Sequence, residues 1–243
     1  MRRFCVAALL AALTLPLCAQ SFIQQIDWSL RGSLLLFPES NGNRSAPMPI
    51  LPSLGVAASW DLSQLLAIEA SLDVYGNTYD YDYTLDRVVP ANDEFRSAFA
   101  IGFLLGFQPV ARFHPWGEKT TVRAYGGLAF DLRLAFPAYG IDSGEDHTDA
   151  GGSTGHSVGD AKSSINSYFW GSGRWFLPFI GGGIDFRFLN ELLLGLDLRL
   201  WIPAYRLWSG EDLPLVEGFR IGIGFRVTFS GPAKSAEVTD AEE

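Results

Sequence analysis

The run from Gly218 to Phe229 alternates strictly between two kinds of side chain. Large apolar groups occupy one face: Phe219, Ile221, Ile223, Phe225, Val227 and Phe229. The other face carries arginine, glycine and threonine: Arg220, Gly222, Gly224, Arg226 and Thr228. A period of two predicts a β-strand whose two faces meet different surroundings. A water-soluble sandwich explains this strand poorly, because its apolar face would need a protein core to pack against.

The same alternation recurs along the chain. The expected strands are 27–37, 50–60, 66–76, 95–113, 120–137, 166–188, 192–205 and 218–230. Their apolar faces together exceed what one small domain can easily bury internally. We therefore predict an all-β fold, an eight-stranded antiparallel transmembrane up-and-down β-barrel with lipid outside and polar groups inside. The alternative is a soluble eight-stranded barrel such as a lipocalin, which would have to fill its interior with this large apolar face.

The connections between the expected strands alternate in length. Short links lie at 61–65, 114–119 and 189–191, and long ones at 38–49, 77–94, 138–165 and 206–217. Short turns on one side and long loops on the other are typical of outer-membrane barrels. Closure matters because only a barrel lets strands satisfy every backbone hydrogen bond within lipid. The pattern predicts a protein of the cell outer membrane, in contact with the lipid bilayer.

The first twenty residues have the composition of a secretory signal peptide. Two arginines precede an apolar run from Phe4 to Leu17, and small residues follow it. Cleavage after Ala19 is expected; the alternative is lipidation of Cys18, which Leu17 before it disfavours. The expected organisation is a signal peptide at 1–19, a barrel at 20–230 and a disordered periplasmic tail at 231–243. Both cysteines lie in the signal segment, which excludes a disulfide scaffold and cysteine catalysis.

Charge excludes one class of partner. Without the signal segment the chain keeps 16 basic and 27 acidic residues, a formal charge of −11. Such an acidic chain is not expected to bind nucleic acid. After the signal segment, no stretch approaches the roughly 18 to 20 apolar residues that a spanning helix needs.

These features together resemble the small eight-stranded outer-membrane barrels of Gram-negative-type bacteria, most nearly the OmpW-like and OmpA/OmpX-like groups. The resemblance covers almost the whole mature chain and rests on the signal segment, the alternating strands, the glycine-rich inner face and the long loops. One departure is that Phe229, the terminal aromatic, is followed by a tail from Ser230 to Glu243. A monomer is expected, because a small closed barrel has no free edge to pair with another chain.

The predicted inward faces carry charges of both signs. The candidate ion-pair network in the lumen comprises Arg31, Glu69, Asp73, Arg112, Arg123, Asp131, Arg133, Asp185, Arg187, Asp197, Arg199 and Arg226, with Arg220 beside them. One interpretation is a gate or a narrow polar path. The other is a structural plug, since eight strands enclose an interior that side chains can fill, and charges buried there need partners.

Nearer the long loops, the inward positions are predicted to be apolar. Trp175, Leu177, Phe179 and Trp201 form a candidate pocket in the outer lumen. Pro178 and Pro203 mark a candidate lateral seam, because proline donates no ladder hydrogen bond. The OmpW-like resemblance implies that a small hydrophobic molecule enters such a pocket and leaves sideways into lipid. The alternative places these aromatics in the outer girdle and makes the prolines strand ends.

The long loops are acidic, notably at 80–94 and 142–160. Clustered carboxylates can bind calcium, but the spacing matches no defined metal loop, so we expect a solvated flexible loop, with no metal and no cofactor. The same loops contain serine and histidine, yet no nucleophile, base and orienting group can be assigned together. We therefore do not expect an enzyme.

Two hypotheses for function follow from this reading. The first is a passive conduit, either a narrow porin-like pore or a lateral-diffusion channel, for small hydrophobic molecules. The second is a plugged barrel that acts as a scaffold, with acidic extracellular loops that mediate surface binding, adhesion or envelope stability.

Overall fold

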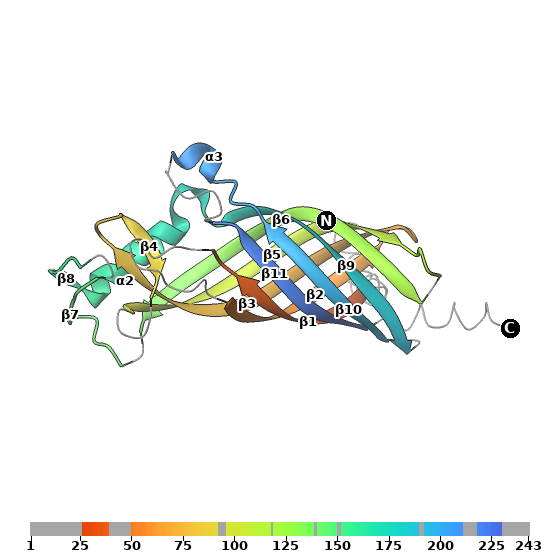
Figure 1. Ribbon diagram of the computed structural model, residues 1–243, viewed down its shortest axis with the longest axis horizontal. Helices are drawn as coiled ribbons and strands as arrows, with labels where there is room; N and C mark the ends of the chain where they lie inside the picture. Colours follow the sequence, from red (N-terminus) through yellow and green to blue (C-terminus); the bar gives the residue numbers. More distant parts are fainter. Residues whose placement is uncertain are drawn as a thin grey trace, which may run out of the picture.

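The computed structural model describes residues 26–38, 50–91, 96–117, 119–138, 140–149, 152–189, 192–210 and 218–229. The expected signal segment and tail therefore lie outside the described residues. Eight long strands form the fold: β1 (Ile26–Leu36), β2 (Ile50–Asp61), β3 (Leu66–Asp82), β5 (Ala98–Phe113), β6 (Thr120–Pro137), β9 (Phe176–Leu189), β10 (Leu192–Trp201) and β11 (Arg220–Phe229). Each pairs antiparallel with its neighbours, and the β2–β3 pairing closes the circle (Figure 1). The predicted closed eight-stranded antiparallel barrel is confirmed.

The register fixes the tilt of the strands. We start at Arg31 on β1 and move each time to the residue opposite on the next strand. Through β2, β3 and β5 this route reaches Asp131 on β6. The opposite route through β11, β10 and β9 leads to Thr121, ten residues away on the same strand. With a rise of about 3.3 Å per residue and a strand spacing of about 4.8 Å, this stagger corresponds to a tilt of about 40°. Each residue then climbs about 2.5 Å along the barrel axis.

The two faces of the barrel wall differ as the alternation predicts. Outward residues such as Leu54 (75% exposed) and Phe225 (73%) leave their apolar side chains on the surface. Inward residues such as Glu69 and Asp197 are buried despite their charge. In the described part of the chain, no helix has the length and apolar character needed to cross a membrane. The outward face of the wall is thus apolar, whereas the inward face carries buried charged residues.

Four strands differ from their expected bounds by three or more residues: β3, β5, β9 and β10. β5 begins at Ala98 instead of residue 95, and β10 ends at Trp201 instead of residue 205. β3 continues to Asp82 and pairs there with a short strand, β4 (Arg87–Pro90). The strand expected at 166–188 is wrong in its first half, where α2 (Val158–Trp170) and η1 (Gly171–Gly173) lie instead. The helix is specified locally, because Ser157 and Asp160 form a capping box at its start. Its buried residues recur at helical spacing: Val158, Ala161, Ile165 and Phe169.

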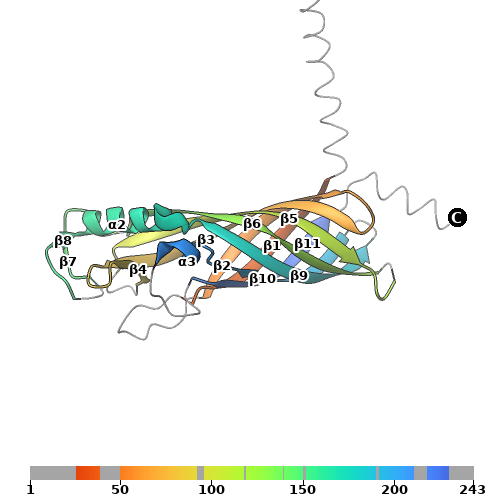
Figure 2. The ribbon, with the colours of Figure 1, turned by 90° about the horizontal axis from the view of Figure 1, so that it is seen from above.

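At the end opposite the short turns, part of the barrel wall continues into a separate layer. We call it the platform: residues 77–82 of β3, 98–101 of β5, 133–137 of β6, β4, α2, and the hairpin of β7 (Asp146–His147) and β8 (His156–Ser157). Figures 1 and 2 show α2 and β4 at one end of an elongated molecule. α2 packs on the sheet through an apolar cluster that includes Tyr79, Ala98 and Phe169. A short helix, α3 (Arg206–Ser209), follows β10.

The helix also completes the exposed edge of β6. The last ladder bond from β6 to the β9 side runs from the Asp131 amide to the Trp175 carbonyl, at 2.8 Å. Beyond it, the Asn166 side chain accepts from the Ala135 amide (2.9 Å) and donates to the Ala135 carbonyl (3.1 Å). One side chain of α2 thus substitutes for a neighbouring strand, which reduces the exposed hydrogen-bonding edge.

Candidate functional site

Glycines make room for the large side chains inside the barrel. A Cβ atom on Gly102 would overlap the ring of Tyr75, and one on Gly181 would overlap the ring of Tyr125. A Cβ atom on Gly222 would lie 2.8 Å from the ring of Trp201. Tyr75, Tyr125 and Trp201 therefore each lie over a glycine of a neighbouring strand. The glycines are evident in the sequence, but the side chain that lies over each one depends on the register between strands.

In the half of the barrel toward the short turns, eight buried charged residues form what we call the lower cluster. They are Arg31, Glu69, Asp73, Arg123, Asp185, Asp197, Arg199 and Arg226. Asp73 joins two strands at once, because its Oδ2 accepts from Arg31 (2.8 Å) and from Arg199 (2.7 Å). Four arginines balance four carboxylates, so the lower cluster as a group is neutral.

The remaining carboxylates of the lower cluster are paired in the same manner. Glu69 lies 2.5 Å from Arg226 and accepts from Gln108 at 2.8 Å. Arg123 contacts Asp185 at 2.5 Å and Asp197 at 2.9 Å. Tyr125 donates to Asp197 at 3.1 Å. Gln108 and Tyr125 were absent from the predicted network, although their inward phase on β5 and β6 was available in the sequence.

A second charged group, which we call the upper cluster, surrounds Asp131. Tyr75 donates to this carboxylate at 2.8 Å, and Arg133 and Arg220 form ion pairs with it. The Arg133 guanidinium lies 3.9 Å from the centre of the Phe169 ring. Phe169 is on the last turn of α2, so the helix covers this end of the barrel interior.

Two residues of the predicted network lie elsewhere. Arg112 pairs with Asp61 at 2.5 Å at the turn end, where both side chains keep contact with water (17% and 28% exposed). Arg187 is exposed and lies beside a register shift between β9 and β10. Its assignment to the lumen is therefore corrected, because the regular alternation of β9 ends at this bulge.

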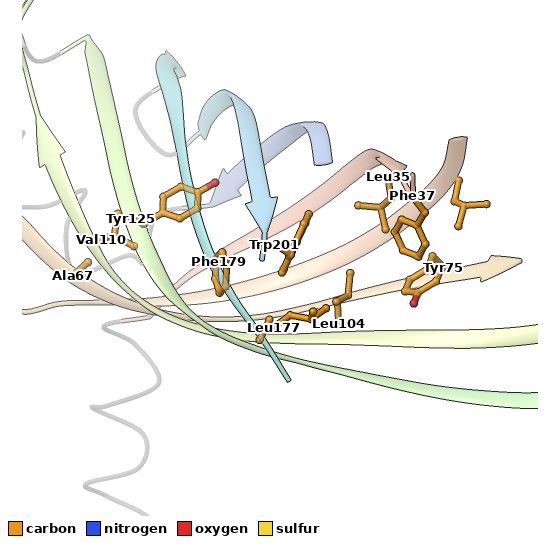
Figure 3. Packing of buried hydrophobic residues seen from close by; sticks show 12 residues of the cluster. Leu35, Phe37, Ala67, Tyr75, Leu104, Val110, Tyr125, Leu177, Phe179 and Trp201 are labelled. Carbon is orange, nitrogen blue, oxygen red and sulfur yellow. The ribbon is translucent and has the colours of Figure 1, made fainter. Parts of the chain in front are cut away.

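Between the two clusters lies an apolar layer. Leu177, Phe179 and Trp201 are all buried there, packed with residues that include Leu104 and Leu35. Figure 3 shows Phe179, Trp201, Leu177 and Leu104 gathered together, with Tyr125 to one side and Tyr75 to the other. Three of the four predicted pocket residues are thus brought together inside the barrel.

Trp175 is the exception among the pocket residues. Its ring stacks on that of Phe130, an outward residue of β6, at 5.9 Å between centroids. The inward assignment of Trp175 is corrected, because β9 begins only at Phe176 and the alternation does not extend before it. The left-handed backbone of Ser172 (φ 52°) in η1 turns the chain just upstream.

The ladder at the predicted seam is continuous. Pro178 lies opposite Leu128, and the β6–β9 pairing continues beyond it to Phe176. On the other side, the Ile202 amide donates to the Pro178 carbonyl at 2.8 Å. Pro203 lies past the end of β10. In this structure the two prolines therefore leave no gap between the described strands.

The acidic loop is folded where the structure describes it, and its carboxylates Asp142, Glu145 and Asp146 are exposed to solvent. His147 on β7 lies 3.0 Å from the buried Asp80 of β3. Asp149, also buried, accepts from the amides of Tyr83 (2.9 Å) and Ser153 (2.6 Å). The Asp160 carboxylate caps α2, and its hydrogen bonds with Ser157 hold the pKa of Asp160 below its ordinary value. Within the described ranges, no group of three or more acidic, histidine or cysteine residues could hold a metal ion.

Comparison with known proteins finds likeness at the level of structure alone. No family model matches the chain, and no curated protein matches it. Neisserial surface protein A (NspA) resembles it with a TM-score of 0.48 and 10% identity over 85% of this chain and 97% of that one. The outer membrane protein OprG from Pseudomonas aeruginosa gives 0.44 and 11%, over 84% and 96%. Ail, the attachment invasion locus protein of Yersinia pestis, gives 0.43 and 7%, over 84% and 95%.

At these identities and TM-scores the likeness says nothing about activity, and the assignment rests on the barrel itself. Every described strand of the wall is paired on both sides, the outer wall is apolar, and the interior holds paired charges. Only a closed barrel meets the hydrogen-bonding demands of lipid with strands, and such barrels occur in outer membranes. The chain is an eight-stranded β-barrel of the outer-membrane kind, located in the outer membrane.

Proposed function

We propose that the protein is a sealed barrel that anchors the platform outside the cell, where the platform binds a partner. The observation that carries this proposal is the difference between the side chains packed inside the barrel and those packed in the platform. The barrel interior is occupied by paired charges and packed rings, and the platform has an apolar core of its own. In outer-membrane barrels the long loops face outward, which would place the platform on the cell surface.

The interior supports a sealed state energetically. A water path along the barrel axis would have to separate the ion pairs of Asp73 and Glu69 or displace the apolar layer around Trp201. Separating a buried ion pair leaves charges in a medium of low dielectric, which is strongly unfavourable. An interior enclosed by eight strands is also narrow enough for side chains to fill.

The surface of the platform indicates the kind of partner. The exposed acidic residues on the platform and in the described loops that join its elements are Asp86, Asp142, Glu145, Asp146 and Asp160. The lysine and arginine side chains among the described platform residues are buried or half-buried. A surface with this imbalance attracts cationic groups and repels anionic ones. We therefore propose a positively charged partner, bound without chemical reaction by a monomeric barrel.

The second candidate is a passive conduit for small hydrophobic molecules. Leu177, Phe179 and Trp201 favour it, since they form an apolar layer at one level of the lumen. A conduit would require this layer to move aside and the strands beside Pro178 to separate. The continuous hydrogen bonding at Pro178 counts against such a route in the described conformation.

One set of measurements on the full-length chain separates the two candidates. In planar bilayers and dye-loaded liposomes, the sealed scaffold should show neither stable conductance nor uptake of an apolar dye. Stable conductance or dye uptake would overturn it and favour the conduit. A labelled lysine-rich peptide should bind the reconstituted protein in low salt, and the double variant Glu145→Gln/Asp146→Asn should weaken that binding.

The control for the binding test is Asp61→Asn, which removes a partly exposed carboxylate at the turn end. This variant should bind the peptide as the unaltered protein does. Equal binding by the platform variant and the unaltered protein would remove the acidic surface from the proposal.

A further inference from the structure

The apolar outer surface of the barrel is much taller on one side than on the other. On β1 its outward residues run from Trp28 to Leu36, a span of about 20 Å at about 2.5 Å of climb per residue. On β6 they run from Val122 to Phe136, and on β5 from Phe99 to Phe113, a span of about 35 Å by the same estimate. The apolar band of outer-membrane barrels is about 25 Å tall.

The two sides face each other across the barrel. In the closed strand order, β5 and β6 are each four strands away from β11 and β1 respectively. The strands are joined by short turns at one end, so the extra height lies at the platform end. There Phe99 pairs with Phe136 in register, and Leu134 is the next outward residue on β6. Their side chains are 41%, 47% and 44% exposed.

The tall side continues around the barrel to β9 and β10. Trp170 at the end of α2 is exposed, and on α3 Leu207 is 87% exposed beside the exposed Trp208. The Trp208 indole donates to the Ser172 carbonyl at 2.8 Å, which holds α3 against η1. Figure 1 shows α3 projecting sideways at the junction of barrel and platform.

We call the six exposed apolar residues at this end of the tall side the collar: Phe99, Leu134, Phe136, Trp170, Leu207 and Trp208. We propose that the lipid of the outer leaflet covers the collar, so that the membrane boundary lies higher along β5, β6, β9 and β10 than along β11 and β1. On β6 the collar is continuous with the lipid-facing wall, because Leu132, Leu134 and Phe136 follow one another on the same face. Tryptophan near a barrel rim also prefers the membrane interface.

Lipid accounts for the collar without any other occupant. Hydrocarbon chains adjust to a tall apolar wall by local thickening or by tilt of the protein, and both adjustments cost little. Water against the same phenylalanine and leucine side chains would be unfavourable. The other possible occupants are a second copy of this chain and a protein partner, and these are outcomes of the test below.

The test uses spin labels on the full-length chain reconstituted in phospholipid vesicles. Cys5→Ser and Cys18→Ser remove the two native thiols, and single cysteines then replace Phe136, Leu207, Phe225 or Glu145. Phe225 is the reference for lipid, because it is exposed at mid-wall, and Glu145 is the reference for water. The measurement is accessibility of each label to oxygen relative to a water-soluble nickel chelate.

We expect the oxygen-to-nickel ratio at 136 and 207 to match that at 225 and to exceed that at 145 several-fold. A ratio at 136 or 207 equal to that at 145 would place the collar in water and overturn the proposal. Low accessibility to both reagents would mean that protein covers the collar, which also overturns it. If the variant at 136 does not fold, a label at Leu134, on the same strand and face, provides the same measurement.

Discussion

The barrel interior and the platform are built from continuous strands, yet different interactions hold them. Inside the barrel, Asp73 and Glu69 connect strands through ion pairs and hydrogen bonds. On the platform, α2 presses Ala161, Ile165 and Phe169 onto β3 and β6. The reason is the solvent. Lipid surrounds the barrel and offers apolar side chains no gain from turning inward, whereas water around α2 drives the apolar face of this helix onto the sheet.

The interior depends on charges that are balanced as a group, so the loss of one affects several partners. The platform depends on apolar contact and on backbone hydrogen bonds at its edges. A single substitution there should therefore cost less stability, and its effect should be local. The following predictions test this contrast in order of expected effect.

The largest effect is expected from Asp73→Asn. The substitution leaves Arg31 and Arg199 without their shared carboxylate in a buried site. Breaking a buried ion pair costs about 3–5 kcal/mol, so the free energy of unfolding should fall by about that much. Guanidinium unfolding of the protein in vesicles, followed by tryptophan fluorescence, measures it.

The matched control is Asp61→Asn, which breaks the partly exposed pair with Arg112. Pairs in contact with water contribute about 1 kcal/mol or less. Similar decreases in the free energy of unfolding for Asp73→Asn and Asp61→Asn would show that burial does not distinguish the lower cluster from the Asp61–Arg112 pair at the turn end.

A smaller and local effect is expected from Asn166→Leu. This change removes both hydrogen bonds to the Ala135 backbone at the edge of β6. An unsatisfied backbone group costs about 1–3 kcal/mol, so the platform should open more often while the barrel remains closed. Hydrogen exchange should be faster at the Ala135 amide and unchanged at Gly195 in the barrel wall.

The control for Asn166→Leu is Ser167→Ala, an exposed neighbour on α2. It should leave exchange at Ala135 unaltered. If Asn166→Leu instead accelerated exchange throughout the barrel, the platform and the interior would form one cooperative unit.

A still smaller effect is expected from Ser157→Ala at the start of α2. Ser157 accepts from the Asp160 amide as the N-cap. Loss of an N-cap typically costs about 1 kcal/mol, which should appear as faster proteolysis within α2. Ser163→Ala, which removes an exposed hydroxyl contact to Gly159, serves as the control. Equal rates for the two variants would exclude the capping box as a determinant of the helix.

The smallest effect is a dependence on pH. Hydrogen bonds from Ser157 lower the pKa of Asp160 in the folded state. A carboxyl with a lowered folded pKa contributes stability above its unfolded pKa of about 4, and that stability is lost as the pH falls through the folded value. Proteolysis of α2 by an acid-active protease should therefore increase below about pH 4. In Asp160→Asn this acid-dependent increase should be absent, and its persistence would assign it to another group.

The sequence predicted the wall of the barrel well and the platform poorly. β1, β2, β6 and β11 lie within two residues of their expected bounds, because their alternation of period two is uninterrupted. The helix α2 was missed because 166–188 was interpreted as one long strand. The capping box at Ser157 and the spacing of Ala161, Ile165 and Phe169 were the available signals.

The candidate site shows the same limit. The phase of each strand assigned most of the predicted charges to the inward face, and Arg31 and Asp197 are among those that are buried. It could not place Arg187 or Trp175, which lie where the alternation stops. Nor could it say which arginine meets which carboxylate, since that depends on the stagger of strands far apart in the chain.

The sequence alone determined the number of wall strands, which face of each meets lipid, and the charged character of the interior. These properties follow from alternation within a single strand and from the demand of lipid for paired backbone and apolar surface. The tertiary structure alone decided the pairing of Asp73 with Arg31 and Arg199 and the replacement of a neighbouring strand by α2 at the edge of β6. Those depend on the register between distant segments and on contacts that exist only once the barrel has closed.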